Sequence, residues 1–200
     1  MSLQIKKEDG VVYDPVFLKI LEDIPGGVTV KTDRFPTTTK EIKKGTLLNA
    51  MTGASIGLYN VIKTVKTVAA VVSGVTVLAV EPADHLFKAG EFIFLCGVTA
   101  STISRVSATA IAVMQTLLNT GGLVASGSVL YETPTIATAT PLYGANCILR
   151  DNVKVRDEEG NLLDNLFAGA VVRGTVDESE LPYFVTDTDK TNLTVRIRFA

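Results

Sequence analysis

The chain has 200 residues, of which 46% are hydrophobic, and its formal net charge at pH 7 is −2. A chain of this length buries roughly 70% of its unfolded surface on folding, so one ordinary domain or two small ones can form a core without disulfides or metals. The weak net charge gives no reason to expect nucleic acid or an anionic membrane surface as a partner.

Charged residues are concentrated at the two ends of the chain. Residues 1–44 hold 8 basic and 7 acidic side chains and residues 150–200 hold 7 and 10, whereas the 105 residues between hold 4 and 4. The longest apolar run there, Val68–Val80, has 13 residues, fewer than the roughly 20 that a membrane-spanning helix needs. We therefore expect no membrane span, and we expect other subunits or a larger assembly to cover part of this uncharged region.

The two cysteines, Cys96 and Cys147, lie far apart in sequence, and Met1–Lys7 lacks the apolar segment of a signal peptide. We expect synthesis in a reducing cytosol, with both thiols free and buried as small hydrophobic side chains.

A short helix is predicted near the start, after residues 1–13, which show no pattern. Asp14 suits the N-cap, Pro15 suits the first helical position, and Pro25-Gly26-Gly27 ends the segment. Apolar residues recur between them at helical spacing, namely Phe17, Ile20, Leu21 and Ile24. Because a helix of about nine residues is marginal alone, it either packs on its own domain or helps to attach the chain to a partner.

The chain then enters a predicted β domain, which spans residues 28–59 and 133–200. Val28, Val30 and Thr32 alternate with polar neighbours as in a half-buried strand, and Phe35-Pro36 breaks the pattern. Ile42–Leu48 is typical of a turn that leads into an apolar strand.

Residues 60–132 are a predicted insertion of short strands. Val61–Val72 and Val75–Val80 flank Ser73-Gly74, a hairpin signal, and further apolar runs follow at intervals typical of small barrels or sandwiches. Gln115–Asn119 fits a helical turn, but short apolar runs do not distinguish this from a strand. Residues 133–141 are uncharged and threonine-rich, which predicts a linker or an extended edge.

The stretch from residue 143 to residue 176 predicts two strands joined by a charged turn. Cys147–Leu149 is apolar, residues 153–156 alternate between valine and a basic residue, and Phe167–Val172 is apolar apart from a glycine. The turn between them is supplied by residues 157–161, which include glycine and asparagine. After an acidic loop, residues 187–192 predict a turn or short helix, and residues 195–199 predict a closing strand.

One catalytic motif matches literally, because Gly53-Ala54-Ser55-Ile56-Gly57 fits the G-x-S-x-G nucleophile elbow. Its context does not fit. The segment after it, Leu58–Val65, is rich in β-branched residues where a helix is required, and the single histidine, His85, follows Asp84 in a predicted turn. A lone histidine also cannot form a multi-histidine metal site.

Carboxylates gather in the C-terminal loops, where they are candidates for a calcium site or an acid/base pair. They are Asp157, Glu158, Glu159, Asp177, Glu178, Glu180, Asp187 and Asp189. None of these runs has the spacing of a calcium loop, so we expect solvated loops. No phosphate-binding loop and no basic stripe interleaved with aromatic residues is present. We predict no catalytic, cofactor-binding or metal-binding residue, and no enzyme.

Four segments in this order resemble the head decoration proteins of tailed bacteriophages, the lambda-type family of capsid cement proteins, in a longer prophage form. The segments are Ile42–Leu48, Leu142–Val153, Gly169–Val176 and Leu181-Pro182, and together they cover about half of the chain. The insertion at residues 60–132 departs from a minimal decoration protein, and it leaves open whether the chain also projects a head fibre.

The resemblance implies a small β-barrel or β-tulip-like domain, with an inserted β domain and a short N-terminal helix within an arm at residues 1–27. It implies homotrimers on the outer surface of the virion capsid, made in the bacterial cytoplasm, that bind the major capsid protein. The implied capsid-contact residues lie in the segment 28–40, where Val28–Val30 is expected to add a strand to a capsid edge. They are Val28, Thr29, Val30, Lys31, Phe35 and Pro36. The implied structural turns are at Gly45, Gly144, Gly169, Gly174 and Pro182.

Three functions stay open at this point. The first is a structural protein that stabilises an expanded capsid or forms a head fibre, acting through contact area and avidity. The second is a virion module that binds a receptor or glycan, although aromatic residues make up only 6% of the chain. The third is an enzyme that uses Ser55.

Overall fold

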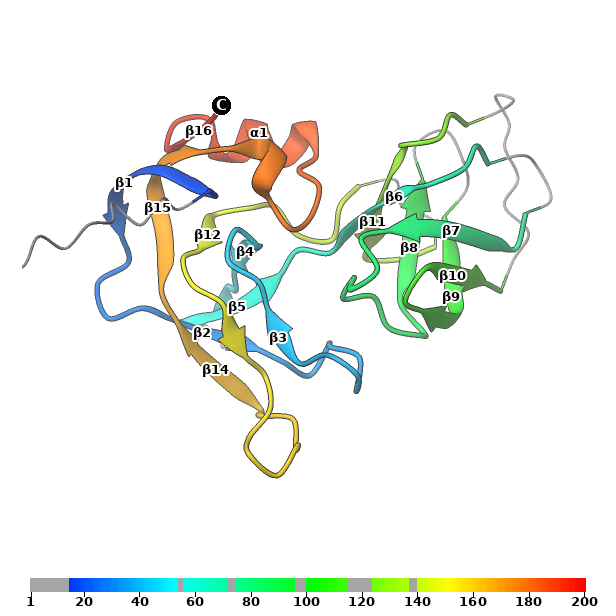
Figure 1. Cartoon of the computed structure of the whole chain (residues 1–200), viewed down its shortest axis with the longest axis horizontal. Coiled ribbons are helices and arrows are strands. Elements are labelled where there is room, and N and C mark those ends of the chain that lie inside the picture. The colour runs from blue at the N-terminus through cyan, green and yellow to red at the C-terminus, as the bar shows by residue number, and fades with distance from the viewer. Residues whose placement is uncertain (1–14, 54–55, 72–74, 96–99, 115–123, 137–139) are drawn as a thin grey trace, which may run out of the picture.

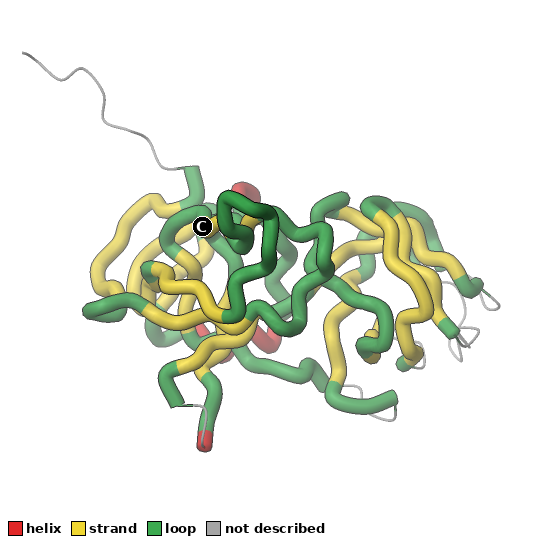
Figure 2. Tube along the Cα trace, turned by 90° about the horizontal axis from the view of Figure 1, so that it is seen from below, coloured by secondary structure: helices red, strands yellow, loops and turns green. Residues whose placement is uncertain are grey.

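The computed structural model describes residues 15–53, 56–71, 75–95, 100–114, 124–136 and 140–200. They form two lobes that lie side by side along the long axis of the molecule (Figure 1). The described residues of 15–61 and 140–200 form the base lobe, and the described residues of 62–136 form the barrel lobe. Strands dominate both lobes, as the view from below also shows (Figure 2), and the predicted mainly β class is confirmed.

The base lobe is a curled sheet of eight described strands, in the order β1-β15-β12-β4-β5-β2-β14, with β16 beside β15. These strands are β1 (Phe17–Asp23), β2 (Val28–Lys31), β4 (Leu47–Ala50), β5 (Leu58–Val61), β12 (Cys147–Leu149), β14 (Asn165–Ala168), β15 (Ala170–Val176) and β16 (Ile197–Phe199). A separate ribbon pairs β3 (Glu41–Ile42) with β13 (Val153–Lys154). The helical elements among the described residues are η2 (Glu178–Glu180) and α1 (Asp187–Leu193).

The sheet curls because its two ends meet in one continuous stretch of chain. Only Gly169 separates β14, which pairs with β2, from β15, which pairs with β12 and β1. A Cβ atom on Gly169 would lie 3.1 Å from Nε of Arg150, so the bend is closely packed. The base lobe is therefore a half-barrel.

Both faces of the central strands are buried, in two separate cores. Leu48 and Leu149 belong to the core inside the half-barrel, whereas their neighbours Leu47 and Ile148 belong to a second core that includes Leu193 of α1. Successive side chains of a strand point to opposite faces. Continuous apolar runs such as Cys147–Leu149 are the sequence signature of such doubly covered strands.

The barrel lobe is a closed barrel in the order β10-β7-β6-β11-β8-β9. Its strands are β6 (Thr64–Thr67), β7 (Val77–Glu81), β8 (Phe92–Leu95), β9 (Ser101–Ser107), β10 (Ala110–Val113) and β11 (Val129–Thr133). Its core contains Val65, Phe87, Ile93, Ile111 and Leu130. The chain enters this lobe after β5 and leaves it after β11, so the lobe is held to the base by two crossing segments.

The predicted N-terminal helix is wrong, because residues 17–23 form strand β1. Of the four apolar residues at helical spacing, Phe17 is buried and Ile24 is half-buried, but Ile20 and Leu21 are exposed. Five of the seven β1 residues instead pair with residues of β15, with three register shifts. Tertiary pairing overrides a marginal local propensity here, and the segment belongs to the sheet of the base lobe.

The end of the chain agrees more closely with its pattern. Residues 187–193 form α1, whose N-cap Thr186 accepts a hydrogen bond from the Asp189 main-chain N–H, and the predicted closing strand appears as β16.

The predicted charged turn after Arg156 also joins two strands. These strands do not pair with each other, however, since β13 pairs with β3 and β14 pairs with β2. The predicted hairpin turn Ser73-Gly74 and the predicted turn Gln115–Asn119 lie outside the described residues.

Candidate functional site

The residues predicted to contact a capsid lie in the base lobe, four of them in β2 and Phe35 and Pro36 in the loop that follows it. Val28, Val30 and Phe35 are buried in the core of this lobe, and Thr29, Lys31 and Pro36 are half-buried. Strand β2 pairs with β14 along one edge and with β5 along the other. The prediction that Val28–Val30 adds a strand to a capsid edge is therefore wrong for this fold, because β2 has no free edge.

The predicted turn residues have mixed outcomes. Gly45 occupies a turn with φ +85°, and a Cβ atom on it would lie 2.9 Å from Cδ of Pro182, which itself lies in a bend. Gly144 lies in a loop and Gly169 at the bend between β14 and β15. Gly174 was predicted to be a structural turn, which is wrong, since it lies inside β15.

His85 and Cys147, two of the residues weighed for chemistry, are both buried. His85 is buried, and its Nε2 lies 3.0 Å from the main-chain O of Ser107. Burial lowers the pKa of His85 and raises the pKa of the Cys147 thiol to about 12. Ser55 and Cys96 lie outside the described residues.

Strand β1 is the first candidate interaction surface. It ends the strand order of the base sheet, and among described strands it pairs with β15 alone. Leu18, Ile20 and Leu21 are 45%, 43% and 58% exposed. An edge strand that presents three large aliphatic side chains is a ready site for association. We call these three residues and their strand the β1 edge.

The β1 edge is anchored to the base lobe at both ends. Phe17 is buried in the second core, while Asp23 accepts a hydrogen bond from Arg150 Nη1 at 2.7 Å. In the middle, a Cβ atom on Gly174 would lie 2.4 Å from the main-chain O of Lys19. Only glycine at this position lets β1 approach β15 so closely, so the exposed aliphatic residues are held on a fixed backbone.

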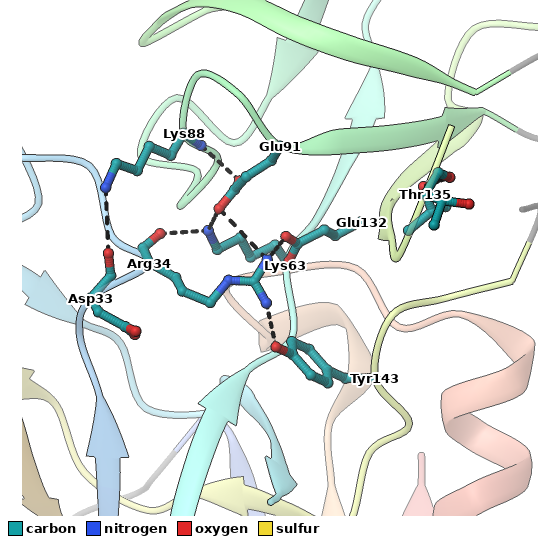
Figure 3. A network of polar contacts seen from close by, with 9 residues as sticks. Asp33, Arg34, Lys63, Lys88, Glu91, Glu132, Thr135 and Tyr143 are labelled. Atoms are coloured by element: carbon teal, nitrogen blue, oxygen red, sulfur yellow. Dashed lines mark hydrogen bonds and ion pairs between the residues drawn. The ribbon is translucent and has the colours of Figure 1, made fainter. Parts of the chain in front are cut away.

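A buried ion pair between Lys63 and Glu91 marks the junction of the two lobes (Figure 3). Lys63 lies between β5 and β6, its side chain is 1% exposed, and its Nζ donates to Glu91 Oε1 and, at 2.6 Å, to the main-chain O of Arg34. Burial lowers the pKa of Lys63 to about 8, and the neighbouring Glu91 carboxylate offsets part of this effect.

Arg34 joins the same network from the base lobe. Its Nη2 donates to Oε1 of Glu132 at the end of β11, and its Nη1 donates to the Tyr143 hydroxyl, over whose ring the guanidinium also lies at 5.2 Å. The Glu132 side chain is 4% exposed, and its Oε2 has no hydrogen-bond partner in the described part of the chain. The network thus ties both crossing segments to the base lobe.

Further contacts join the lobes beside this network. Thr64 Oγ1 donates to the main-chain O of Phe184 at 2.5 Å, Tyr183 Oη donates to the main-chain O of Asp84 at 3.2 Å, and Lys43 pairs with Asp84. Buried, hydrogen-bonded charges favour one arrangement over its alternatives. These contacts hold the two lobes in one relative orientation, as a rigid spacer requires.

A groove of about 760 Å³ lies between the lobes on one side of the junction. Its base-lobe wall is the segment Pro36–Glu41, and its barrel-lobe wall comprises the segments Ala83–Ala89 and Ser104–Ala108. The basic residues along it are Lys40, Lys88 and Arg105, and the acidic ones are Glu41 and Asp84. We call this hollow the inter-lobe groove.

No protein-family model, no curated protein and no solved structure matches this chain. Among the described residues, no helix is long and apolar enough to cross a membrane. The same residues contain no group of three or more histidine, cysteine or acidic side chains placed to hold a metal ion.

Sequence reasoning missed the β1 edge and the junction. The β1 edge was predicted as a helix because the apolar residues of this segment recur at the spacing of an amphipathic helix. The junction had a usable signal, since Lys63, Glu91 and Glu132 are three of the eight charged residues between positions 45 and 149. Isolated charges in an apolar region are commonly buried in pairs, but which residues pair depends on the fold.

Proposed function

We propose that the chain is a structural virion protein that binds the outside of an expanded phage capsid as a symmetric oligomer and stabilises it. The single observation that carries the proposal is the β1 edge, where three aliphatic side chains stand exposed on an anchored strand. The order of segments that resembles phage decoration proteins gives the partner, which is the major capsid protein. The homotrimer implied by that resemblance stays a prediction.

The β1 edge replaces residues 28–36 as the proposed capsid contact. Burying half-exposed leucine or isoleucine side chains contributes about 1 kcal/mol each, so one copy binds weakly through this strand. Several copies joined in one oligomer bind neighbouring capsid subunits together, and the effective concentration of the later contacts then makes the whole attachment tight.

The junction supports the stabilising part of the proposal. A protein that clamps neighbouring subunits must resist deformation, and the base lobe has both faces of its central strands buried while the Arg34–Glu132 and Lys63–Glu91 pairs fix the second lobe. The barrel lobe then projects from the base as a rigid head.

Co-sedimentation tests this proposal. Expanded shells of the major capsid protein encoded in the same genome are mixed with the wild-type chain, with a Leu18→Asp/Leu21→Asp variant, and with Val77→Asp. Val77, in the barrel lobe, is 58% exposed, the same as Leu21, so it is a matched control.

We expect the wild type and Val77→Asp to sediment with the shells, and the double variant to bind at least tenfold more weakly. Absence of the wild-type chain from the shell pellet would overturn the proposal. Equal binding by the double variant would show that the β1 edge is not the capsid contact.

A further inference from the structure

The inter-lobe groove carries basic side chains that the described part of the chain leaves without an ion pair. Lys40 on the base-lobe wall and Arg105 on the barrel-lobe wall are exposed and line the groove. Of its two acidic residues, Asp84 is already neutralised by Lys43, and the exposed Glu41 offsets one of the three basic side chains, so the groove keeps a net positive charge. The third basic side chain, Lys88, donates from Nζ to the main-chain O of Asp33 at 3.4 Å. The groove therefore offers one cation on each wall to an acidic group from outside.

An acidic loop projects from the underside of the base lobe, between β13 and β14, at the bottom of Figure 1. Residues 157–161 are all exposed. Asp157 is occupied within the loop, since it accepts hydrogen bonds from Asn161 N at 2.7 Å and Asn161 Nδ2 at 3.1 Å. This turn holds the loop in shape and places Glu158 and Glu159 at its tip, where Glu159 Oε2 accepts a long hydrogen bond from the same Asn161 Nδ2 at 3.4 Å.

The loop and the groove lie next to each other on the molecule. Arg156, where the loop begins, donates from Nε to the main-chain O of Thr39 at 2.9 Å, and Val155 N donates to the main-chain O of Lys40. Both acceptors belong to the base-lobe wall of the groove. Residues 157–161 do not line the groove of their own chain.

We propose that two copies of this chain bind each other by placing the acidic tip Glu158-Glu159 of each copy in the inter-lobe groove of the other. The complementarity is between two carboxylates and the cations Lys40 and Arg105, and a groove of about 760 Å³ is within the range that holds a ligand of this size. Because loop and groove are neighbours on one surface, the contact repeats around a two-fold axis, which is the commonest symmetry of protein association.

This inference rests on the self-association in the proposed function and adds a specific surface to it. On a shell, the two-fold contact joins copies that belong to neighbouring oligomers, so it links decoration units to each other independently of the β1 edge. It is electrostatic and surface-exposed, so it weakens as salt is added.

Disulfide trapping tests the contact directly. In a Cys96→Ser background, a Glu158→Cys chain and an Arg105→Cys chain are mixed at about 100 µM and oxidised gently. We expect a cross-linked pair in the mixture, at least tenfold more than in a matched mixture of Glu180→Cys with Arg105→Cys. Glu180 is an exposed acidic residue at η2. Raising the salt from 0.05 to 0.5 M should reduce the yield severalfold.

Equal yields in the two mixtures, or no cross-link in either, would overturn the proposed contact. Circular dichroism of each variant alone establishes that it is folded before mixing. Capsids are absent from this experiment, so its failure is distinct from a failure of capsid binding.

Discussion

Arg34 in the base lobe donates through Nη2 to Oε1 of Glu132 in the barrel lobe, across 98 residues of sequence. This pair and the adjacent Lys63–Glu91 pair are the most buried ion pairs of the described chain, and they lie where the chain passes between the lobes. The relative orientation of the lobes therefore depends on a few charged side chains.

Replacing Glu132 by Gln should destabilise the protein by about 2 kcal/mol, because the Arg34 guanidinium then faces a neutral amide in place of its buried carboxylate partner. Urea unfolding measures this loss. The matched control is Glu22→Gln, since Glu22 pairs with Arg173 at 3.6 Å with both side chains more than half exposed, and such surface pairs contribute less than about 1 kcal/mol. Equal losses in the two variants would show that the junction pair has no special role.

The buried Lys63 should give the stability a distinctive alkaline dependence. Its pKa falls to about 8 in the folded chain, whereas in the unfolded chain it is about 10.4. Between these pH values the unfolded state binds more protons, so the contribution of Lys63 to the free energy of unfolding rises with pH.

A Lys63→Met variant isolates this effect. The deprotonation of Cys147 and Tyr183 acts in the opposite direction, since burial raises both pKa values, but it is common to both proteins. The wild-type free energy of unfolding minus that of the variant should increase from pH 8 to pH 10. Parallel pH curves would contradict the assignment.

His85 should lower the stability on the acid side. Burial depresses its pKa in the folded chain, so below about pH 6.5 the unfolded chain takes up a proton first and the folded state loses stability. Gln in its place can still donate to the main-chain O of Ser107. Between pH 7 and pH 5, the Tm should therefore fall less steeply for His85→Gln than for the wild type. Identical slopes of Tm against pH would exclude His85 as the cause.

Gly174→Ala should loosen the β1 edge. The new Cβ atom would lie 2.4 Å from the main-chain O of Lys19. Because the atoms in contact are main-chain atoms, the clash is relieved only if the β1 backbone moves away from β15. Gly169→Ala is the control, because its Cβ atom would meet the end of the flexible Arg150 side chain at 3.1 Å. Hydrogen exchange should accelerate in residues 17–23 for the first variant and change little there for the second. Unchanged exchange in both variants would mean that β1 does not need this glycine.

The sequence predicted strands correctly where the strand buries its side chains. Cys147–Leu149 and Ile197–Phe199 are strands because apolar runs and alternation match the faces they bury. Residues 17–23 were predicted wrongly because an exposed edge strand has no reason to keep a two-residue period. The pairing of β2 on both edges, which leaves residues 28–30 no free edge for strand addition, depends on contacts with residues 165–168 and 58–59 that no local pattern encodes.

The candidate site was the least predictable part. The β1 edge exists because Gly174 and a buried Phe17 hold an otherwise exposed strand, and the inter-lobe groove exists because the junction network sets two lobes side by side. Both depend on residues more than a hundred positions apart, such as Lys19 with Gly174 and Arg34 with Tyr143.

The thermal disassembly of expanded shells, with and without the protein, measures whether the chain stabilises a capsid. Scanning calorimetry at saturating protein should show the shell transition moved several degrees upward by the wild type and unmoved by Leu18→Asp/Leu21→Asp. If the wild-type chain fails to bind the shells, or binds them and leaves the transition temperature unchanged, the chain is not a capsid-stabilising protein.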